Sequence, residues 1–294
     1  MADDSAKPVP PRRPEFERVL PPLAAVGDAA RPLSAFERLI NFAGVRRILI
    51  IAVLAMLWQT YGAWLANPLI FPSFASVMDA LWESAVRGNL MLRAWSSIVV
   101  LAKGYVIGVA LALAITALAV STRIGSDLLS TLTAMFNPLP AIALLPVALL
   151  WFGLGEGSLV FVLVHSVLWP LALNTHAGFT AVSDTLRMAG RNYGLSGLRY
   201  VVSILIPAAF PSILAGLKIA WAFAWRTLIA AELVFGVSSR SGGLGWFIFE
   251  NRNELNIPEV FAGLIMVILI GLAMEGVVFR AVEARTVRRW GMQR

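Results

Sequence analysis

Residues Ser158–Val182 read SLVFVLVHSVLWPLALNTHAGFTAV and contain no Asp, Glu, Lys or Arg. A helix needs roughly 20 apolar residues to cross the hydrocarbon core of a bilayer, so this stretch is long enough for one crossing. The preceding stretch Leu128–Gly155 is equally free of those charged residues, and Glu156 separates the two. Together they predict two adjacent membrane-spanning helices joined by a turn at Glu156.

The composition of the whole chain is that of a membrane protein. Its 294 residues are 59% hydrophobic and only 14% charged, and the mean hydropathy is +0.77. Soluble domains carry nearer a quarter of charged residues. The fold class that we predict is therefore all-α integral membrane, with six transmembrane helices in one domain. The six spans lie near Ile48–Leu65, Ala94–Val120, Leu128–Phe152, Ser158–Val182, Ser212–Val234 and Val260–Phe279.

Positive charges flank these spans and predict their orientation. We divide the chain into a cytoplasmic, largely disordered tail over residues 1–46, a transmembrane domain over 47–283 and a basic cytoplasmic tail over 284–294. The first tail is rich in proline and lacks the early apolar run of a secretory signal. Because Lys and Arg favour the cytoplasmic side and the number of spans is even, we expect both termini to be cytoplasmic.

Several other classes of function are excluded at this stage. The net charge is +7, but the Lys and Arg residues lie beside the apolar spans and form no single basic face. We therefore expect no nucleic-acid partner. The absence of cysteine excludes disulfides and thiolate catalysis. His165 and His176 would lie about 16 Å apart along one helix, which is too far to share a metal ion. We interpret both as core histidines and expect no metal site.

Shorter features predict local structure outside the spans. Pro72–Leu90 has apolar residues at helical spacing and predicts a short interfacial helix, and Leu33–Phe42 has a weaker form of the same pattern. Gly104 and Gly108 have the spacing of small residues at a contact between two membrane helices. Lys218, near a span end, is expected to extend toward the membrane surface.

The long loop at about residues 184–211 has the composition of a docking element. It combines Arg187, Arg191 and Arg199 with apolar residues at helical spacing. A half-polar helix at the membrane surface cannot bury its apolar side alone, so it needs a partner. We expect this helical segment to end at Pro207 and Pro211.

At this loop the chain resembles the permeases of ATP-binding-cassette (ABC) importers. Their cytoplasmic loop carries Glu-Ala-Ala, three residues, Gly, nine residues, Ile, one residue and Leu-Pro. Gly194, Ile204 and Pro207 fall in register, Ile206 stands for the leucine, Ala189 keeps one alanine, and Met188 and Gly190 replace the glutamate and the other alanine. Further motifs resemble the nitrate, sulfonate and taurine branch: Phe71-Pro72-Ser73, Asn137-Pro138-Leu139-Pro140, Trp151-Phe152-Gly153, Pro207-Ala208-Ala209-Phe210-Pro211, Ala224-Trp225, Ala231-Glu232 and Gly243-Leu244-Gly245.

The resemblance implies a type I importer permease in the bacterial inner membrane, surrounded by lipid. Its expected partners are a second copy of the chain, two copies of an ATP-binding subunit and an extracytoplasmic substrate-binding protein. ATP and Mg would be bound by the ATPase, and this chain, which has no phosphate-loop motif, would bind no cofactor and catalyse no reaction. The implied cargo is a small anion: a sulfonate, taurine, nitrate or an organic carboxylate. The residues implied in coupling to the ATPase are Ala189, Gly190, Gly194, Leu195, Ser196, Arg199 and Pro207.

A substrate pathway is predicted around Arg226, deep in the fifth span. A charge there is costly and nearly always faces the bundle interior or a wet cavity, where its planar fork can bind an anionic group. The alternatives are an ion pair with Glu275 or bonding to free backbone carbonyls. Prolines interrupt the third span, and such a break either lines the passage or is a packing kink. The pathway candidates are Arg226, Trp225, Trp221, Asn137, Pro138 and Pro140; packing is the alternative for both tryptophans.

Two other classes of protein remain as alternatives. A secondary transporter driven by an ion gradient needs carboxylates within the membrane, and only Glu232 and Glu275 qualify, both near span ends. Gly194–Gly197 matches the Gly-x-Ser-Gly pattern of intramembrane serine proteases, but it lies in an Arg-flanked surface loop. We therefore favour the ABC permease, with the secondary transporter as the alternative.

Overall fold

The computed structural model describes residues 41–235 and 242–286. All regular structure within these ranges is helical. The chain divides into two compact units, Met1–Leu54 and Ala55–Arg294. The described part of the first unit is the beginning of helix α2 (Ala43–Leu65). Residues 33–40, which hold most of the first interfacial segment that we predicted, lie outside the described ranges.

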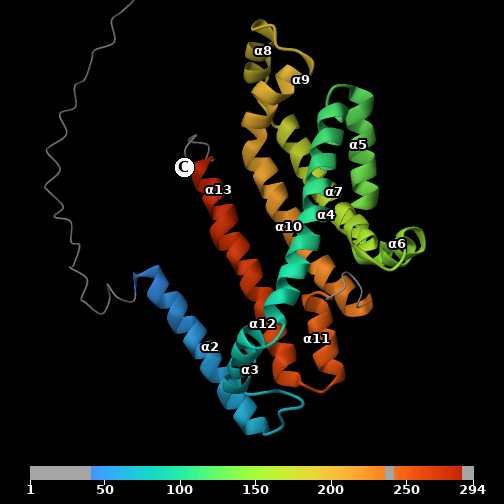
Figure 1. Cartoon of the computed structure of the whole chain (residues 1–294). Coiled ribbons are helices and arrows are strands. Elements are labelled where there is room, and N and C mark those ends of the chain that lie inside the picture. Colours follow the sequence, from blue (N-terminus) through green and yellow to red (C-terminus); the bar gives the residue numbers. More distant parts are fainter. Residues whose placement is uncertain (1–40, 236–241, 287–294) are drawn as a thin grey trace, which may run out of the picture. The chain divides into compact units, whose positions relative to one another are not determined.

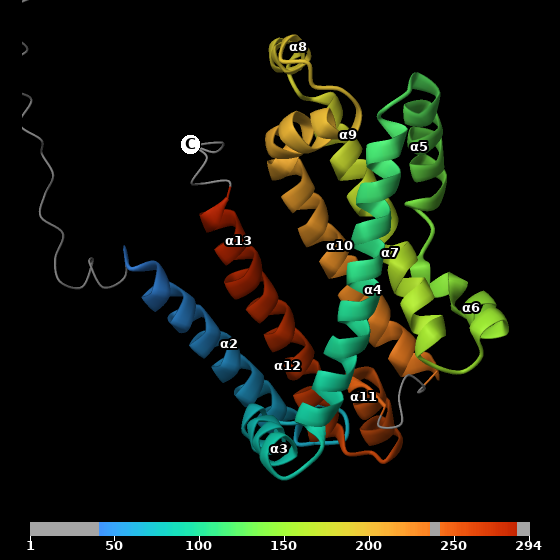
Figure 2. The ribbon, with the colours of Figure 1, turned by 45° about the horizontal axis from the view of Figure 1, so that its top comes forward.

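Within the second unit, the central helix is α7 (Glu156–Thr180), which packs along α4 (Leu90–Ala119) and α10 (Ile206–Phe235) (Figures 1 and 2). Leu163, Val167 and Leu171 on α7 are almost fully buried. The predicted small-residue contact is confirmed, because a methyl group at Gly104 or Gly108 would collide with Leu163 or Val167. Small residues let helix backbones approach closely, which is how helices associate in lipid.

The third span is broken where its prolines lie. Helix α5 (Arg123–Phe136) ends at Asn137, and a 3-10 turn η1 (Ala141–Leu144) leads into the short α6 (Leu145–Phe152). The two halves meet at 87°, so the described residues contain five helices long and apolar enough to cross a membrane and one bent pair. The six predicted spans correspond to these elements, but the third is not a straight crossing helix.

Short helices lie at the end of the second unit that is opposite α8 (Asp184–Asn192) (Figure 1). Helix α3 (Phe74–Val86) fulfils the prediction of a short helix in Pro72–Leu90 and begins at Ser73, whose hydroxyl accepts a hydrogen bond from the Ser76 N–H. Helix α11 (Leu244–Asn253) turns into α12 (Ile257–Ala273), which continues through a π-helical turn η3 (Met274–Phe279) into α13 (Arg280–Arg285). Our sequence interpretation did not include α11, although it buries Leu244, Phe247 and Ile248.

One expectation about the long loop was wrong. Pro207 and Pro211 do not end a helical segment: α8 (Asp184–Asn192) and α9 (Gly197–Tyr200) are followed by a π-helical turn η2 (Val201–Leu205) that runs into α10. Both prolines therefore lie inside one continuous helix. In η2 the Ile206 N–H bonds to the Val201 carbonyl five residues back, and such a local change of helix type accommodates a residue that lacks an N–H.

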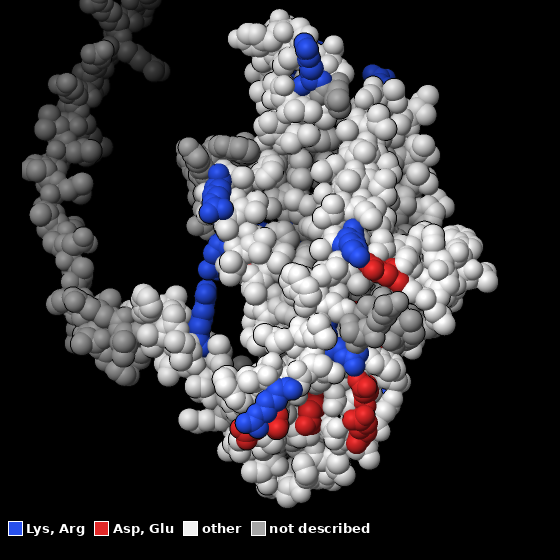
Figure 3. Space-filling view, viewed as in Figure 1, with Lys and Arg blue, Asp and Glu red and all other residues white. Residues whose placement is uncertain are grey.

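Charged side chains are unevenly distributed over the two ends of the second unit. On the face shown in Figure 3, most acidic atoms lie toward the end that carries α3 and α11, whereas the tip formed by α8 shows basic atoms. The segment 184–199 contains Arg187, Arg191 and Arg199 against the single acid Asp184. The α8 end is thus the more basic one.

Candidate substrate cavity and coupling loop

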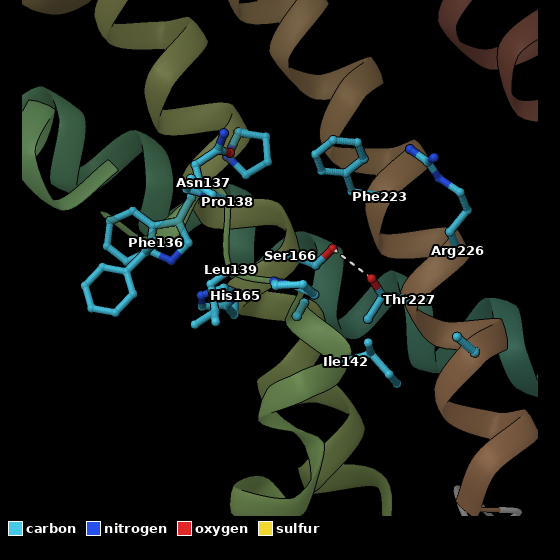
Figure 4. Close-up of a pocket in the computed structure, with 15 residues that line it drawn as sticks. Phe136, Asn137, Pro138, Leu139, Ile142, His165, Ser166, Phe223, Arg226 and Thr227 are labelled. Carbon is cyan, nitrogen blue, oxygen red and sulfur yellow. Dashed lines mark hydrogen bonds between the residues drawn. The ribbon is translucent and has the colours of Figure 1, made fainter. Parts of the chain in front are cut away.

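The break in the third span opens a cavity of about 460 Å³ between the α5–η1 connection, α7 and α10 (Figure 4). Proline residues in the connection leave no helix to fill this space. Its lining is mainly apolar, with a few polar groups. The lining residues are Phe136, Asn137, Pro138, Leu139, Pro140, Ala141, Ile142, His165, Ser166, Trp169, Pro170, Phe223, Arg226, Thr227 and Ala230.

The structure brings four of the six pathway candidates to this cavity: Arg226, Asn137, Pro138 and Pro140. The two tryptophans are not among its lining residues. Trp225 is buried, and its Nε1–H donates to the Val267 carbonyl of α12 at 3.3 Å. Trp221 packs edge-on against Tyr105 and Phe279. Both therefore have the packing environment that was their alternative interpretation.

Arg226 is exposed, and its side chain bonds to its own helix. Its Nε–H donates to the Ala222 carbonyl one turn earlier at 3.0 Å, and its guanidinium carbon lies 5.0 Å from the Phe223 ring centre. The alternative partner, Glu275, instead lies 3.5 Å from Lys218 Nζ. Within the described ranges no carboxylate lies within ion-pair distance of Arg226, so the Glu275 alternative is not formed.

Opposite Arg226, the wall carries polar atoms from α5 and α7 (Figure 4). Asn137 Oδ1, Trp169 Nε1 and both ring nitrogens of His165 are buried and have no hydrogen-bond partner among the described residues. The Ser166 and Thr227 hydroxyls lie 3.4 Å apart across α7 and α10. We interpreted His165 as a core histidine, and nothing in the sequence indicated that it lines the cavity. It does so because the bend of the third span exposes that face of α7.

Helix α8, the first helix of the predicted coupling loop, has a well-defined C-terminal end. Gly194 has a φ of +72°, a backbone conformation that is strained for residues with a Cβ. Its N–H donates to the Arg191 carbonyl at 2.9 Å, and the Leu195 N–H donates to the Gly190 carbonyl at 3.1 Å. These two bonds form a Schellman motif that satisfies the last carbonyls of α8. The glycine of the importer pattern thus lies where only glycine is unstrained.

The other coupling candidates lie on both sides of this turn. Gly190 is buried against Ile204 and Tyr200, whereas the preceding Ala189 is half-buried. Leu195 and Ser196 line a second cavity of about 430 Å³, together with Arg187 and Arg191. Arg199 on α9 is exposed, and Pro207 lies half-buried in the first turn of α10.

Comparison with known proteins gives the family. The sequence model of one protein family, the binding-protein-dependent transport system inner membrane component, matches residues 104–288. This range includes the cavity and the coupling loop. This chain belongs to that family. The permease is 30% identical over 235 residues to a putative ABC transporter permease of Methanocaldococcus jannaschii, covering 79% of this chain and 87% of the relative.

Further relatives carry named substrates. The permease is 30% identical over 220 residues to the putative aliphatic sulfonates transport permease SsuC of Escherichia coli K12, covering 73% of this chain and 80% of the relative. It is 28% identical over 238 residues to the nitrate import permease NrtB of Synechocystis, covering 79% and 85%. With its apolar helices, the permease is a multi-pass inner membrane protein.

Proposed function

We propose that this permease imports a small anion, delivered by a binding protein and driven by a separate ATPase. The observation that carries the proposal is the cavity beside the break in the third span, with Arg226 as its cation. A guanidinium inside a membrane domain attracts an anion and bonds it through two parallel N–H donors. The names of the relatives, which include permeases for aliphatic sulfonates, nitrate and taurine, support an anionic cargo.

The coupling loop is the proposed point of contact with the ATPase. Helix α8 ends in the basic tip of the bundle, and Met188 and Tyr193 are strongly exposed there, with 57% and 85% of their surface accessible. Exposed apolar side chains at a membrane protein's polar end suit a protein partner. We place this tip and both termini in the cytoplasm, where basic loops are favoured.

Transport would follow alternating access by two copies of the permease, each carrying one ATP-binding subunit. ATP closure in those subunits would move α8, and α10, which follows α8 and α9 in the chain, would transmit the motion to the cavity. The hinge is the break at Pro138, since two helices that meet at a turn change their angle more easily than one continuous helix. ATP and Mg stay in the ATPase, and this chain performs no chemical step.

The carboxylates argue against a carrier driven by an ion gradient. Such a carrier needs a carboxylate that an ion can reach. Glu232 is 1% exposed and accepts hydrogen bonds from Ser97 and Gly245, and Glu275 lies beside Lys218. Neither lines the cavity around Arg226.

The proposal is tested by purifying the tagged permease from its native cells, where any partner subunits are also made, and by measuring uptake in liposomes. We expect an ATPase to copurify with the permease. Anion uptake should require both ATP and the substrate-binding protein, and vanadate should stop it. Uptake by the permease alone, driven by a proton or sodium gradient, would contradict the proposal. The control is a preparation whose ATPase carries a disabled phosphate loop.

A further inference from the structure

The walls of the Arg226 cavity are mostly apolar, whereas a small inorganic anion needs hydrogen-bond donors around it. Ten of the fifteen lining residues carry apolar side chains, and the cavity volume of about 460 Å³ is within the range of sites for organic molecules. We infer that the cavity binds an organic anion with a flat aromatic body, such as an aromatic sulfonate or carboxylate. This inference rests on the proposed function and names its class of cargo.

The anionic group is matched by Arg226. Because Nε is engaged with the Ala222 carbonyl, the two terminal nitrogens are the groups left to bind, and their spacing suits two oxygens of a sulfonate or carboxylate. Phe223 lies beside the guanidinium at the same side of the cavity (Figure 4). Among the described residues that line the cavity none is a carboxylate, so an ammonium group on the cargo would meet no counter-charge from them.

The aromatic body is matched by the opposite wall. Phe136 and Trp169 are stacked with ring centres 5.0 Å apart and an angle of 18° between their planes. His165 lies edge-on to both, at 6.4 Å from Phe136 and 6.2 Å from Trp169. Flat rings pack well in offset or edge-on contact with such a cluster. Nitrate has no apolar surface to bury there, and the aromatic wall would not replace the hydration that nitrate loses on that side.

The unpaired polar atoms of this wall refine the cargo further. Trp169 Nε1, His165 and Asn137 Oδ1 are buried without partners among the described residues, and an unmet polar group of this kind is costly. A hydroxyl on the ring, at the end away from the anionic group, both donates and accepts hydrogen bonds. We therefore expect a hydroxylated aromatic anion to bind more tightly than the plain one.

The experiment measures binding to the full-length permease in lipid nanodiscs with radiolabelled benzenesulfonate in a scintillation proximity assay. Competitors are unlabelled benzenesulfonate, 4-hydroxybenzenesulfonate, methanesulfonate, taurine and nitrate. We expect benzenesulfonate to bind at least about tenfold more tightly than methanesulfonate, since the ring buries an apolar area comparable to a phenylalanine side chain. The hydroxylated compound should bind more tightly still, and nitrate should compete most weakly.

Matched variants locate the binding. Arg226→Gln should weaken benzenesulfonate binding at least about tenfold, the scale for loss of a charged hydrogen-bonding partner. Trp169→Leu and, at the opposite side, Phe223→Leu should reduce the preference for benzenesulfonate over methanesulfonate. Lys103→Gln is the control, because Lys103 is a cation on α4 that lies outside the cavity lining and pairs with Glu156. Each variant is used only if its thermal melt matches that of the parent.

Equal competition by nitrate, taurine or methanesulfonate would overturn the inference, as would unchanged binding in Arg226→Gln or no binding of benzenesulfonate. These outcomes test the class of cargo and do not decide whether the permease is an ATP-driven importer. A permease that takes up only aliphatic or inorganic anions with its ATPase keeps that function and loses this inference. If aromatic anions bind but uptake does not depend on ATP, the inference about the cargo stands and the proposed function is wrong.

Discussion

The hydroxyl oxygen of Ser97 on α4 lies 2.8 and 2.9 Å from the two carboxylate oxygens of Glu232 on α10. The same hydroxyl accepts the Leu244 N–H, and Glu232 accepts the Gly245 N–H, both at 2.8 Å. The carboxylate therefore lies at the N-terminus of α11, where free N–H groups and the helix dipole favour negative charge. These bonds join α4, α10 and α11 at the end of the bundle opposite α8.

Replacing Glu232 by Ala should destabilise the permease. The change removes two hydrogen-bonding acceptors and leaves buried N–H and O–H groups unpaired, at a cost of about 2–4 kcal/mol in the free energy of unfolding. The measurement is a thermal melt of the purified protein followed by tryptophan fluorescence. Glu254→Ala is the control, because Glu254 is exposed and its carboxylate accepts a hydrogen bond from the exposed Asn256 side chain two residues on. A melt equal to that of the control would contradict the structural role of Glu232.

Gly194→Ala should destabilise the end of α8, because a Cβ at a φ of +72° costs about 1–2 kcal/mol. We expect lower ATP-dependent uptake and faster amide hydrogen exchange in residues 189–195 than in the parent. The control is Gly155→Ala, since Gly155 has an extended backbone with a φ of 171° and a Cβ added there would meet open space. Identical exchange in the two variants would count against the Schellman motif.

Gly108→Val should disrupt the contact between α4 and α7. Any Cβ at this position would lie 2.7 Å from the Val167 Cβ, so the two helices must separate. Overpacking of a tight contact typically costs about 1–3 kcal/mol. We expect a lower yield of folded protein in size-exclusion chromatography. At Gly276, where a Cβ has open space, the corresponding Gly276→Ala variant should behave like the parent.

Arg226→Gln should leave the complex assembled and hydrolysing ATP while reducing anion uptake at least about tenfold, because glutamine keeps polarity but loses the charge and one of the two parallel donors. The measurements are copurification of the ATPase, ATP hydrolysis and uptake in the same proteoliposomes. Lys103→Gln is again the matched control. Unaltered uptake would reject a substrate role for Arg226.

Met188→Asp should weaken docking of the ATPase, because Met188 is 57% exposed on α8 and a carboxylate there would lose apolar contact with the partner. We expect at least about tenfold less copurified ATPase and an unchanged melt of the permease alone. Trp82→Asp on α3 changes a side chain at the opposite end that is 73% exposed, and this variant should copurify normally. Loss of ATPase in both variants would argue for a general defect.

The sequence by itself determined the membrane class, the positions of the spans and the place where the third span breaks. Each of these depends on neighbouring residues: a crossing needs a continuous apolar run whose backbone bonds internally, and a proline frees the carbonyl four residues before it. The fold family could be predicted for the same reason, since the residues of the coupling loop around Gly194 lie close together in the chain.

Only the tertiary structure decided which side chains meet. Trp225 and Arg226 are neighbours, but successive residues on a helix point about 100° apart, so one packs on α12 and the other reaches the cavity. The rotation of α10 about its axis, which decides between these faces, comes from its packing against α7. Likewise Ser97 and Glu232 are 135 residues apart and meet because α4 and α10 pack on α7 and on each other. A uniformly apolar helix carries too little periodicity to predict such a rotation.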